Sequence, residues 1–527
     1  MTPDMDFAEG RKKADTFLME KLADKDFSRM RRIWEMCEDV FAGETAVKSK
    51  DDRYIYRPVS KTGVTEAVRK AWEAYKGRGK LSKLPRQTLE KITGTLTANP
   101  PEASFGGKAA ALEPMREDAT PFGDGLDALF ARTVYNVLKY GRHCMLLEPE
   151  ENSSARGFHI SEYSPKKFLR AVPGYDADGR SFAKMVLLDT SDVEYDLKRW
   201  KNVYRPSLTV LALDGAGRYF QARLGGAAIG IKNYDSAGLP VYESNVAYRD
   251  GMAAMIDALR RLDLTDPRPS DMTEIVYPTK YGRTLDRIPF TCCNAADLNF
   301  TKFSEPPLAD VCMLALHALN ADCDHQQAIF LTTDPLPTFT GLAEKSGSGG
   351  GAINLTPDRA LKLTGEADFK FVSPPGDGLK IQADNIKSIL DEMRLLSLAV
   401  SGMEDSGNTS GVALELKQEY RTADIRLLNQ NCAKAIEEQL RCAGRYLGMD
   451  PVTAAEEIKY TPSRDIGRMK PTLADALTLA QVADRFTLTR HELREWAERN
   501  LGFEHRDFDE VAAIMDAERI ADGAGAF

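Results

Sequence analysis

The residues of this chain that could do chemistry do not form the patterns that a nucleotide site requires. No G-x-x-x-x-G-K-[ST] motif is present, which excludes a P-loop ATPase. The glycine-rich run at 346–351 could cradle a phosphate, but no helix N-terminus follows it to supply aligned N–H groups. We therefore interpret this run as the tip of a loop.

Metal chemistry is also poorly supported by the spacing of the candidate ligands. Four potential zinc ligands lie in one segment: Cys312, His317, Cys323 and His325. Their spacing matches no zinc-ligand pattern, and no second Cys/His pair lies nearby. Asp322 and Asp324 could begin a two-metal nuclease site, but residues two apart on a helix do not face each other. We expect no catalytic residue, no metal and no cofactor, and hence that the protein is not an enzyme.

The overall charge argues against a protein that clamps nucleic acid. The chain has 527 residues and a formal net charge of −9, with 43% hydrophobic and 28% charged residues. This composition is ordinary for a soluble folded protein of two to four structural units. A protein that grips DNA through many phosphate contacts should be basic. Any nucleic acid that this chain meets should be passed along or touched at a few points.

The start of the chain and its cysteines indicate the compartment. Residues 1–6 contain no basic region followed by an apolar run, so we expect no signal peptide. No window approaches 18 consecutive apolar residues, so we expect no membrane span. The eight cysteines are scattered, which favours reduced thiols in a cytosolic setting over a disulfide framework.

The first half of the chain reads as helices followed by an antiparallel meander. Helical patterns cover 5–42, 64–98 and 123–140, and Gly43 is a natural stop for the first. Residues 54–56 could form a short strand, and 144–147 a short buried one. From about 158 to 291, short alternating runs are separated by turns, of which 176–179 and 214–217 are hairpin signals. The first turn resembles a calcium loop but has Leu187 where that loop needs Glu. The sequence therefore predicts a predominantly helical α+β fold.

The second half predicts two helices around a small β insert, and then a very long helix. One helix runs from Pro306 to about Leu331, and the insert covers 333–375, with strand-like segments at 352–355 and 369–372. A second helix covers 379–400. After a small acidic loop, 412–447 spans 36 residues without Pro and without Gly until Gly444. A helix of that length would be roughly 54 Å long. Shorter helices should follow near 472–486, 490–500 and 509–522.

The order of these parts resembles that of the portal proteins of tailed bacteriophages. Residues 34–48 resemble the W-x-x-x-x-D-x-x-x-G-x-x-x-V-K opening of one portal subfamily, and 75–78 and 88–101 resemble its helix that ends before Pro-Pro. Residues 307–330 and then 334–337 are similar to the helix that leads into the portal clip. Residues 401–414 resemble the segment before the long helix. The resemblance covers most of the chain.

This resemblance implies a ring, usually of twelve copies, around a central DNA channel at one capsid vertex. The implied parts of each subunit are a wing at 1–302 (with the meander at about 158–291) and 412–470, stem helices at 303–332 and 378–400, a clip at 333–377, a tunnel loop at 401–411 and a crown at 471–527. The implied function is the packaging and later ejection of genomic double-stranded DNA. The implied partners are the terminase motor, the major capsid or scaffold protein, a tail or neck adaptor, and transient DNA, with no membrane. The implied location is the virion, after assembly in the host cytoplasm.

Two other function classes remain as alternatives. One is another adaptor ring of the virion neck or tail, a class that is usually smaller and lacks the wing, stem and clip order. The other is a DNA-processing enzyme, which the missing ATPase and metal motifs disfavour.

The charges of the implied channel are those expected of a conduit that does not bind DNA tightly. Twelve copies at −9 each would total about −108, a ring that repels DNA overall. The implied tunnel loop has two acids and no Lys or Arg, and its channel residues are Glu404, Asp405, Ser406, Gly407, Asn408, Thr409 and Ser410. The glycines of the loop would allow hinge motion. The alternative is a plain surface loop between two helices.

The predicted second stem helix carries a basic stripe and an apolar stripe, and the implied ring gives each of them a role. Lys380, Lys387 and Arg394 lie seven apart on one face, either as a solvated stripe or as a basic ring that lines the channel. An apolar stripe should pack against neighbouring copies and not around a private core. Its members are Leu379, Ile386, Ile389, Leu390, Met393, Leu396 and Leu398.

Overall fold

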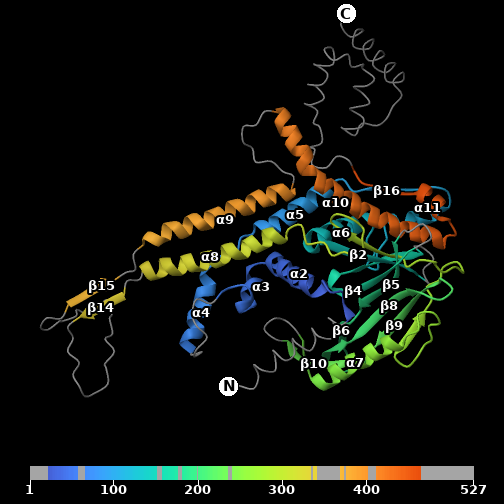
Figure 1. Cartoon of the computed structure of the whole chain (residues 1–527), viewed down its shortest axis with the longest axis horizontal. Helices are drawn as coiled ribbons and strands as arrows, with labels where there is room; N and C mark the ends of the chain where they lie inside the picture. The colour runs from blue at the N-terminus through green and yellow to red at the C-terminus, as the bar shows by residue number, and fades with distance from the viewer. Residues whose placement is uncertain are drawn as a thin grey trace, which may run out of the picture. The chain divides into compact units, whose positions relative to one another are not determined.

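A computed structural model describes residues 22–56, 66–150, 157–175, 181–198, 200–234, 240–333, 336–340, 368–372, 376–401 and 411–463. These residues belong to the first of two compact units, Met1–Ser463 and Arg464–Phe527. Helices and antiparallel sheets occur together in the first unit (Figure 1). The fold is therefore of the α+β class, as the sequence predicted.

Helices account for much of the described structure. They are α2 (Phe27–Ala42), α3 (Glu44–Ser49), α4 (Glu66–Arg78), α5 (Leu84–Thr97), α6 (Leu126–Tyr140), α7 (Asn245–Arg261), α8 (Ala309–Thr333), α9 (Asp377–Ser401), α10 (Gly411–Tyr446) and α11 (Pro451–Glu457). The 36 residues of α10 confirm the long helix predicted at 412–447. Among the described helices, none is both long and apolar enough to cross a membrane.

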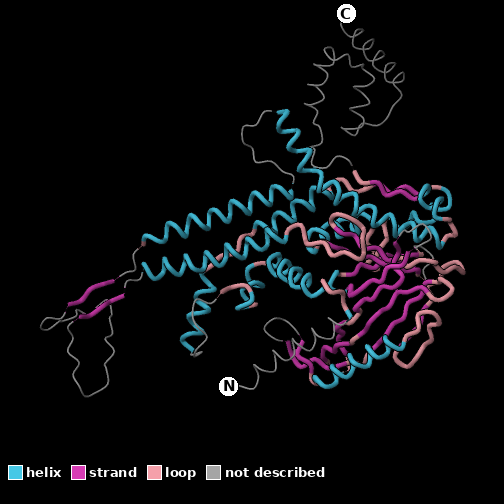
Figure 2. Tube along the Cα trace, viewed as in Figure 1, coloured by secondary structure: helices cyan, strands magenta, loops and turns pink. Residues whose placement is uncertain are grey.

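In the part of the chain that the structure describes, the strands (magenta in Figure 2) form five separate sheets and not one meander. They are β1 (Glu102–Phe105), β2 (Arg142–Pro149), β3 (Phe158–Tyr163), β4 (Phe168–Tyr175), β5 (Ser181–Asp189), β6 (Asp192–Asp196), β7 (Lys201–Arg205), β8 (Ser207–Leu213), β9 (Tyr219–Gly225), β10 (Ile229–Tyr234), β11 (Pro240–Tyr242), β12 (Thr273–Val276), β13 (Phe290–Asn294), β14 (Leu336–Thr340), β15 (Asp368–Val372) and β16 (Ile458–Thr461). The larger sheets have the orders β12-β9-β8-β5-β4, β11-β10-β7-β6 and β13-β2-β3, and β1 with β16 and β14 with β15 form two-stranded ribbons. All pairs are antiparallel.

One hydrophobic core forms between the five-stranded sheet and two helices. Alternate residues of β8 and β9 point inward, where Val210 and Phe220 are fully buried. Trp34 from α2 and Met255 from α7 belong to the same cluster. Helix α7 was not predicted, although Ser244 caps it by accepting a hydrogen bond from the backbone N–H of Ala247 at 3.1 Å. A Ser before a run with helical apolar spacing was the available signal.

Several strand predictions are confirmed and one is wrong. Strands β5, β8 and β9 contain the predicted runs, and β8 and β9 are joined by the predicted turn at 214–217. The turn at 176–179 and the strand-like segment at 352–355 lie outside the described residues. Residues 54–56 do not form a strand. The carbonyl of Tyr54 and the N–H of Tyr56 instead hydrogen-bond the side chain of Asn320, at 2.8 and 2.9 Å.

A buried arginine organises the loop that leads from β13 into α8. Arg142 is completely buried, and its guanidinium lies between the rings of Phe168 and Phe303, 5.2 and 4.3 Å from their centroids. It donates through Nε to Asn294 at 2.9 Å and through Nη2 to the carbonyl of Lys302. Aromatic faces and carbonyl oxygens thus surround the charge in place of water.

The residue before this arginine must be glycine. Gly141 ends α6 in the left-handed region, with φ 73°. A Cβ at this position would lie 2.4 Å from the carbonyl oxygen of Ser304, in the segment that enters α8. Phe303 also packs against Trp34, whose indole donates to the carbonyl of Tyr140 at 2.7 Å. The end of α6 and the start of α8 therefore hold each other in place.

Replacing Gly141 should destabilise the protein more than replacing another glycine of similar backbone conformation. Gly141→Ala adds both left-handed strain and the overlap with Ser304, at a total cost of about 3 kcal/mol or more. Gly123→Ala is the matched control, because Gly123 has φ 84° and open space around its Cβ position. It should cost only about 1–2 kcal/mol. Thermal unfolding of the two variants checks this, and equal losses of stability would contradict the contact.

Candidate interface on the α8–α9 helical pair

Helices α8 and α9 run side by side in opposite directions, joined through the β14–β15 ribbon (Figure 1). At the ribbon end, Gly376 lies beside Thr332 of α8. Further along, Nδ1 of His325 lies 3.3 Å from Oε1 of Gln382. These helices contain most of the two stem segments predicted at 303–332 and 378–400.

One member of the apolar stripe of α9 is buried within its own chain. Met393 is completely buried, and Ser397 beside the stripe is nearly so. Five further members of the predicted stripe are partly buried: Leu379, Ile386, Ile389, Leu390 and Leu396. Helix α9 contacts α8, α5 and α10. The packing of the partly buried members against neighbouring copies stays a prediction.

Other side chains of the pair are exposed. Ile381 and Leu395 of α9 are 72% and 68% exposed, and Phe330 and Leu331 of α8 are also exposed. Ile381 and Leu395 lie outside the helical spacing of the predicted stripe. Both side chains are accessible to a neighbouring molecule.

The three predicted channel-lining side chains are exposed together on α9. Lys380, Lys387 and Arg394 repeat every seven residues on the side of the helix turned away from Met393. Arg394 forms an ion pair with Asp391 at 2.9 Å. Acidic residues are interspersed on the exposed part of the helix, at Asp384 and Glu392. This surface can touch a polyanion without holding it through an uninterrupted basic row.

The polar half of α8 binds the N-terminal part of the chain. Asp322 accepts from the backbone N–H of Lys80 at 2.8 Å, and Asp324 accepts from the hydroxyl of Tyr75 at 2.6 Å. This hydrogen bond, together with burial, raises the pKa of Tyr75. Within the described part of the chain, no group of His, Cys, Asp or Glu could hold a metal ion.

The residues that resemble a portal opening motif brace α8 in two places. Trp34 packs on Phe303 just before the helix. Lys48 donates to the carbonyl of Gly79 at 2.6 Å. Gly79 lies directly against Cys323, since a Cβ there would come within 2.3 Å of its sulfur. Their observed role is therefore to anchor the helical pair.

All eight cysteines are buried and unbridged. Cys144 and Cys292 are cross-strand partners in β2 and β13, with their sulfurs 3.2 Å apart. The candidate zinc ligands Cys312, His317, Cys323 and His325 form no group that could hold a metal ion among the described residues.

Some predicted site residues lie outside the described residues. They are the tunnel-loop residues Glu404, Asp405, Ser406, Gly407, Asn408, Thr409 and Ser410. The loop separates α9, which ends at Ser401, from α10, which begins at Gly411. Most of the predicted clip and the whole of the predicted crown also lie outside.

Comparison with known families finds one match. Residues 307–447 match a domain of unknown function, DUF4055, over α8 to the C-terminal end of α10. The match covers less than half of the chain. No curated protein matches.

Comparison with solved structures finds matches to chains of gene transfer agent particles. A chain of the "Virion of native gene transfer agent (GTA) particle" is 14% identical with a TM-score of 0.37, over 88% of this chain and 99% of that one. A chain of the "Neck of native GTA particle computed with C12 symmetry" is 13% identical with a TM-score of 0.37, over 85% and 95%. A chain of the "Neck of empty GTA particle computed with C6 symmetry" is 14% identical with a TM-score of 0.38, over 88% and 100%. These scores are too low to establish a common fold or function.

The burial of Met393 predicts that the α9 stripe stabilises the isolated subunit. Met393→Ala should destabilise α9 by about 2 kcal/mol or more, and so make its amides exchange roughly 30-fold faster in the monomer. Ile381→Ala, at an exposed position on the same helix, should change exchange less than threefold. Hydrogen–deuterium exchange of α9 peptides measures both. Unchanged exchange in Met393→Ala would mean that the stripe has no role within the subunit.

Proposed function

We propose that this chain is a portal protein, the subunit of a ring through which double-stranded DNA enters and leaves a viral capsid. The α8–α9 pair carries this proposal. Its exposed apolar side chains fit contacts between copies, and its exposed row of Lys380, Lys387 and Arg394 fits a channel wall. The resemblance of residues 34–48 to a portal opening motif supports the same function.

The exposed apolar side chains of α9 would be removed from water by contacts with neighbouring copies of the chain. Ile381 and Leu395 lie in water in the isolated chain, and removing each from water would contribute about 1.5–3 kcal/mol. In a closed ring, each α8–α9 pair would cover part of the next. Each copy would therefore form this contact with both of its neighbours in the ring.

The charges suggest how DNA could pass without being trapped. Basic and acidic residues alternate on the exposed part of α9, and Arg394 is partly neutralised by Asp391. A ring built this way would guide phosphates past weak contacts. The predicted tunnel loop, with Glu404 and Asp405, would add no cationic trap.

The remaining parts take the roles that the resemblance implies. The β14–β15 ribbon would belong to the clip, where the terminase motor and later a tail or neck adaptor dock. The sheets and α10 would belong to the wing, near the major capsid or scaffold protein. The ring would form in the host cytoplasm and remain in the virion, at one vertex of the capsid.

Native mass spectrometry of the purified protein tests the proposal. We expect closed rings of a single subunit number, about twelve, with a central hole visible by negative-stain microscopy. Rings that bind tail proteins but never a packaging motor would favour another neck or tail adaptor. A monomer with nuclease activity would contradict the proposal.

A further inference from the structure

The hairpin between β6 and β7 exposes two large apolar side chains. Leu197 and Trp200, at its tip, are 73% and 77% exposed. The β6 strand that leads to it is an edge strand and is also mostly exposed. Lys198 lies between the two apolar residues and forms no ion pair with the other residues that the structure describes. The tip therefore offers two apolar side chains and the ammonium group of Lys198, with the carboxylate of Asp196 bonded to the backbone N–H of Lys198.

The left-handed backbone of Trp200 belongs to the turn of the hairpin. Its φ is 52°, a conformation that short hairpin loops commonly use just before the second strand. The turn leaves the indole of Trp200 exposed.

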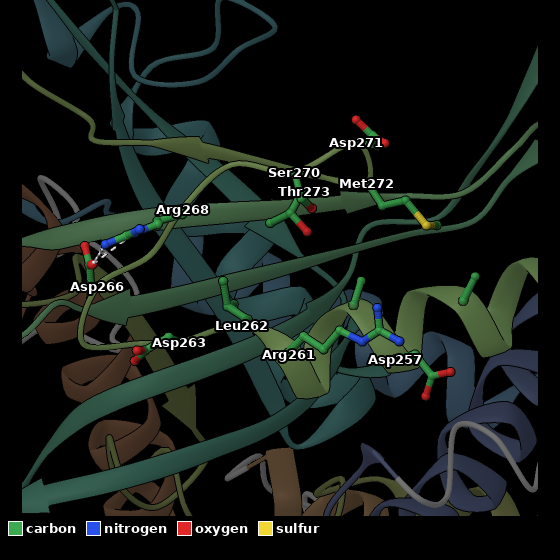
Figure 3. Close-up of a pocket in the computed structure, with 12 residues that line it drawn as sticks. Asp257, Arg261, Leu262, Asp263, Asp266, Arg268, Ser270, Asp271, Met272 and Thr273 are labelled. Carbon is green, nitrogen blue, oxygen red and sulfur yellow. Dashed lines mark hydrogen bonds and ion pairs between the residues drawn. The ribbon is translucent and has the colours of Figure 1, made fainter.

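A groove lined by apolar and acidic residues lies beside the C-terminal end of α7 (Figure 3). Its volume is about 750 Å³, and its apolar lining is Ala254, Ala258, Leu262 and Met272. Its charged lining is Asp257, Asp263, Asp266, Asp271, Arg261 and Arg268, which gives a formal charge of −2. Arg268 is paired with Asp266 at 2.6 Å. Asp263 accepts hydrogen bonds from Thr265, and these lower its pKa, so it is ionised at neutral pH.

The tip and the groove lie at opposite ends of one helix. Lys201, next to the tip, is paired at 2.5 Å with Glu243, which lies just before the start of α7. The groove lies at the other end of α7, which has 17 residues and is therefore about 25 Å long. The tip cannot reach the groove of its own chain. Two complementary surfaces at separate places on a subunit define a head-to-tail contact between copies.

We infer that the β6–β7 tip of one copy inserts into the α7 groove of the next, with the indole of Trp200 on the apolar floor and Lys198 beside Asp263 and Asp271. This contact rests on the proposed ring, whose wings it would join, but it involves none of the residues of the α8–α9 pair. A large, desolvated aromatic residue beside a charge pair is the usual composition of an interface hot spot.

Cysteine cross-linking tests the contact directly. In the double variant Leu197→Cys/Asp271→Cys, mild oxidation of rings should produce covalent oligomers up to the full ring on denaturing gels. Each single variant should remain monomeric on the same gels. Rings that form but give no such ladder would overturn this contact and leave the portal proposal intact. Failure of the unmodified protein to form rings would instead overturn the portal proposal.

Charge exchange provides a second test that does not depend on disulfide geometry. Lys198→Glu should raise the protein concentration needed for half-maximal ring assembly about tenfold, which corresponds to about 1.4 kcal/mol. Adding Asp263→Lys and Asp271→Lys should restore most of the loss. Lys184→Glu, which reverses another exposed lysine, is the control and should assemble normally. Absence of rescue in correctly folded variants would contradict the contact.

Discussion

The buried guanidinium of Arg142 is the interaction that ties the loop before the helical pair to the sheets. A buried cation is stabilised by dipoles and aromatic faces in place of water, and the loop between β13 and α8 supplies several of them. Asn294, the carbonyl of Lys302 and the ring of Phe303 all contact it. These contacts attach the segment that leads into α8 to strand β2.

The same loop also contacts the segment 34–48 near the N-terminus. Trp34 packs on Phe303, and Gly141 leaves room for the backbone at Ser304. Further along α8, Asn320, Asp322 and Asp324 bind segments that precede α5. The polar half of α8, which could suggest a metal or nuclease site, is thus used to attach the helix along its length. In the proposed ring, this rigidity would keep the exposed faces of α8 and α9 aligned between copies.

Long periodic elements could be predicted from the sequence, while contacts between distant segments could not. The ends of α9 and α10 agree with the prediction to within two residues, because Ser401 and Gly411 flank uninterrupted helical patterns. The division of the strands into separate sheets was missed, because it depends on pairings between distant segments, such as β13 with β2 and β1 with β16. The full burial of Met393 also depends on segments distant in sequence, since α9 contacts α5 and α10 as well as α8. The common exposure of Lys380, Lys387 and Arg394 agrees with their spacing on the helix, while their position on a channel wall stays a prediction.

The central claim is that α9 lines a channel that DNA passes through. The most direct measurement is packaging by particles that carry Lys387→Glu and Arg394→Glu in every subunit, with ring assembly checked by native mass spectrometry. Rings that assemble normally but yield about tenfold fewer DNA-filled capsids are the expected result, because a row of carboxylates would repel the phosphates of passing DNA. Normal rings with undiminished packaging would show that this face of α9 does not meet DNA, and would contradict the account.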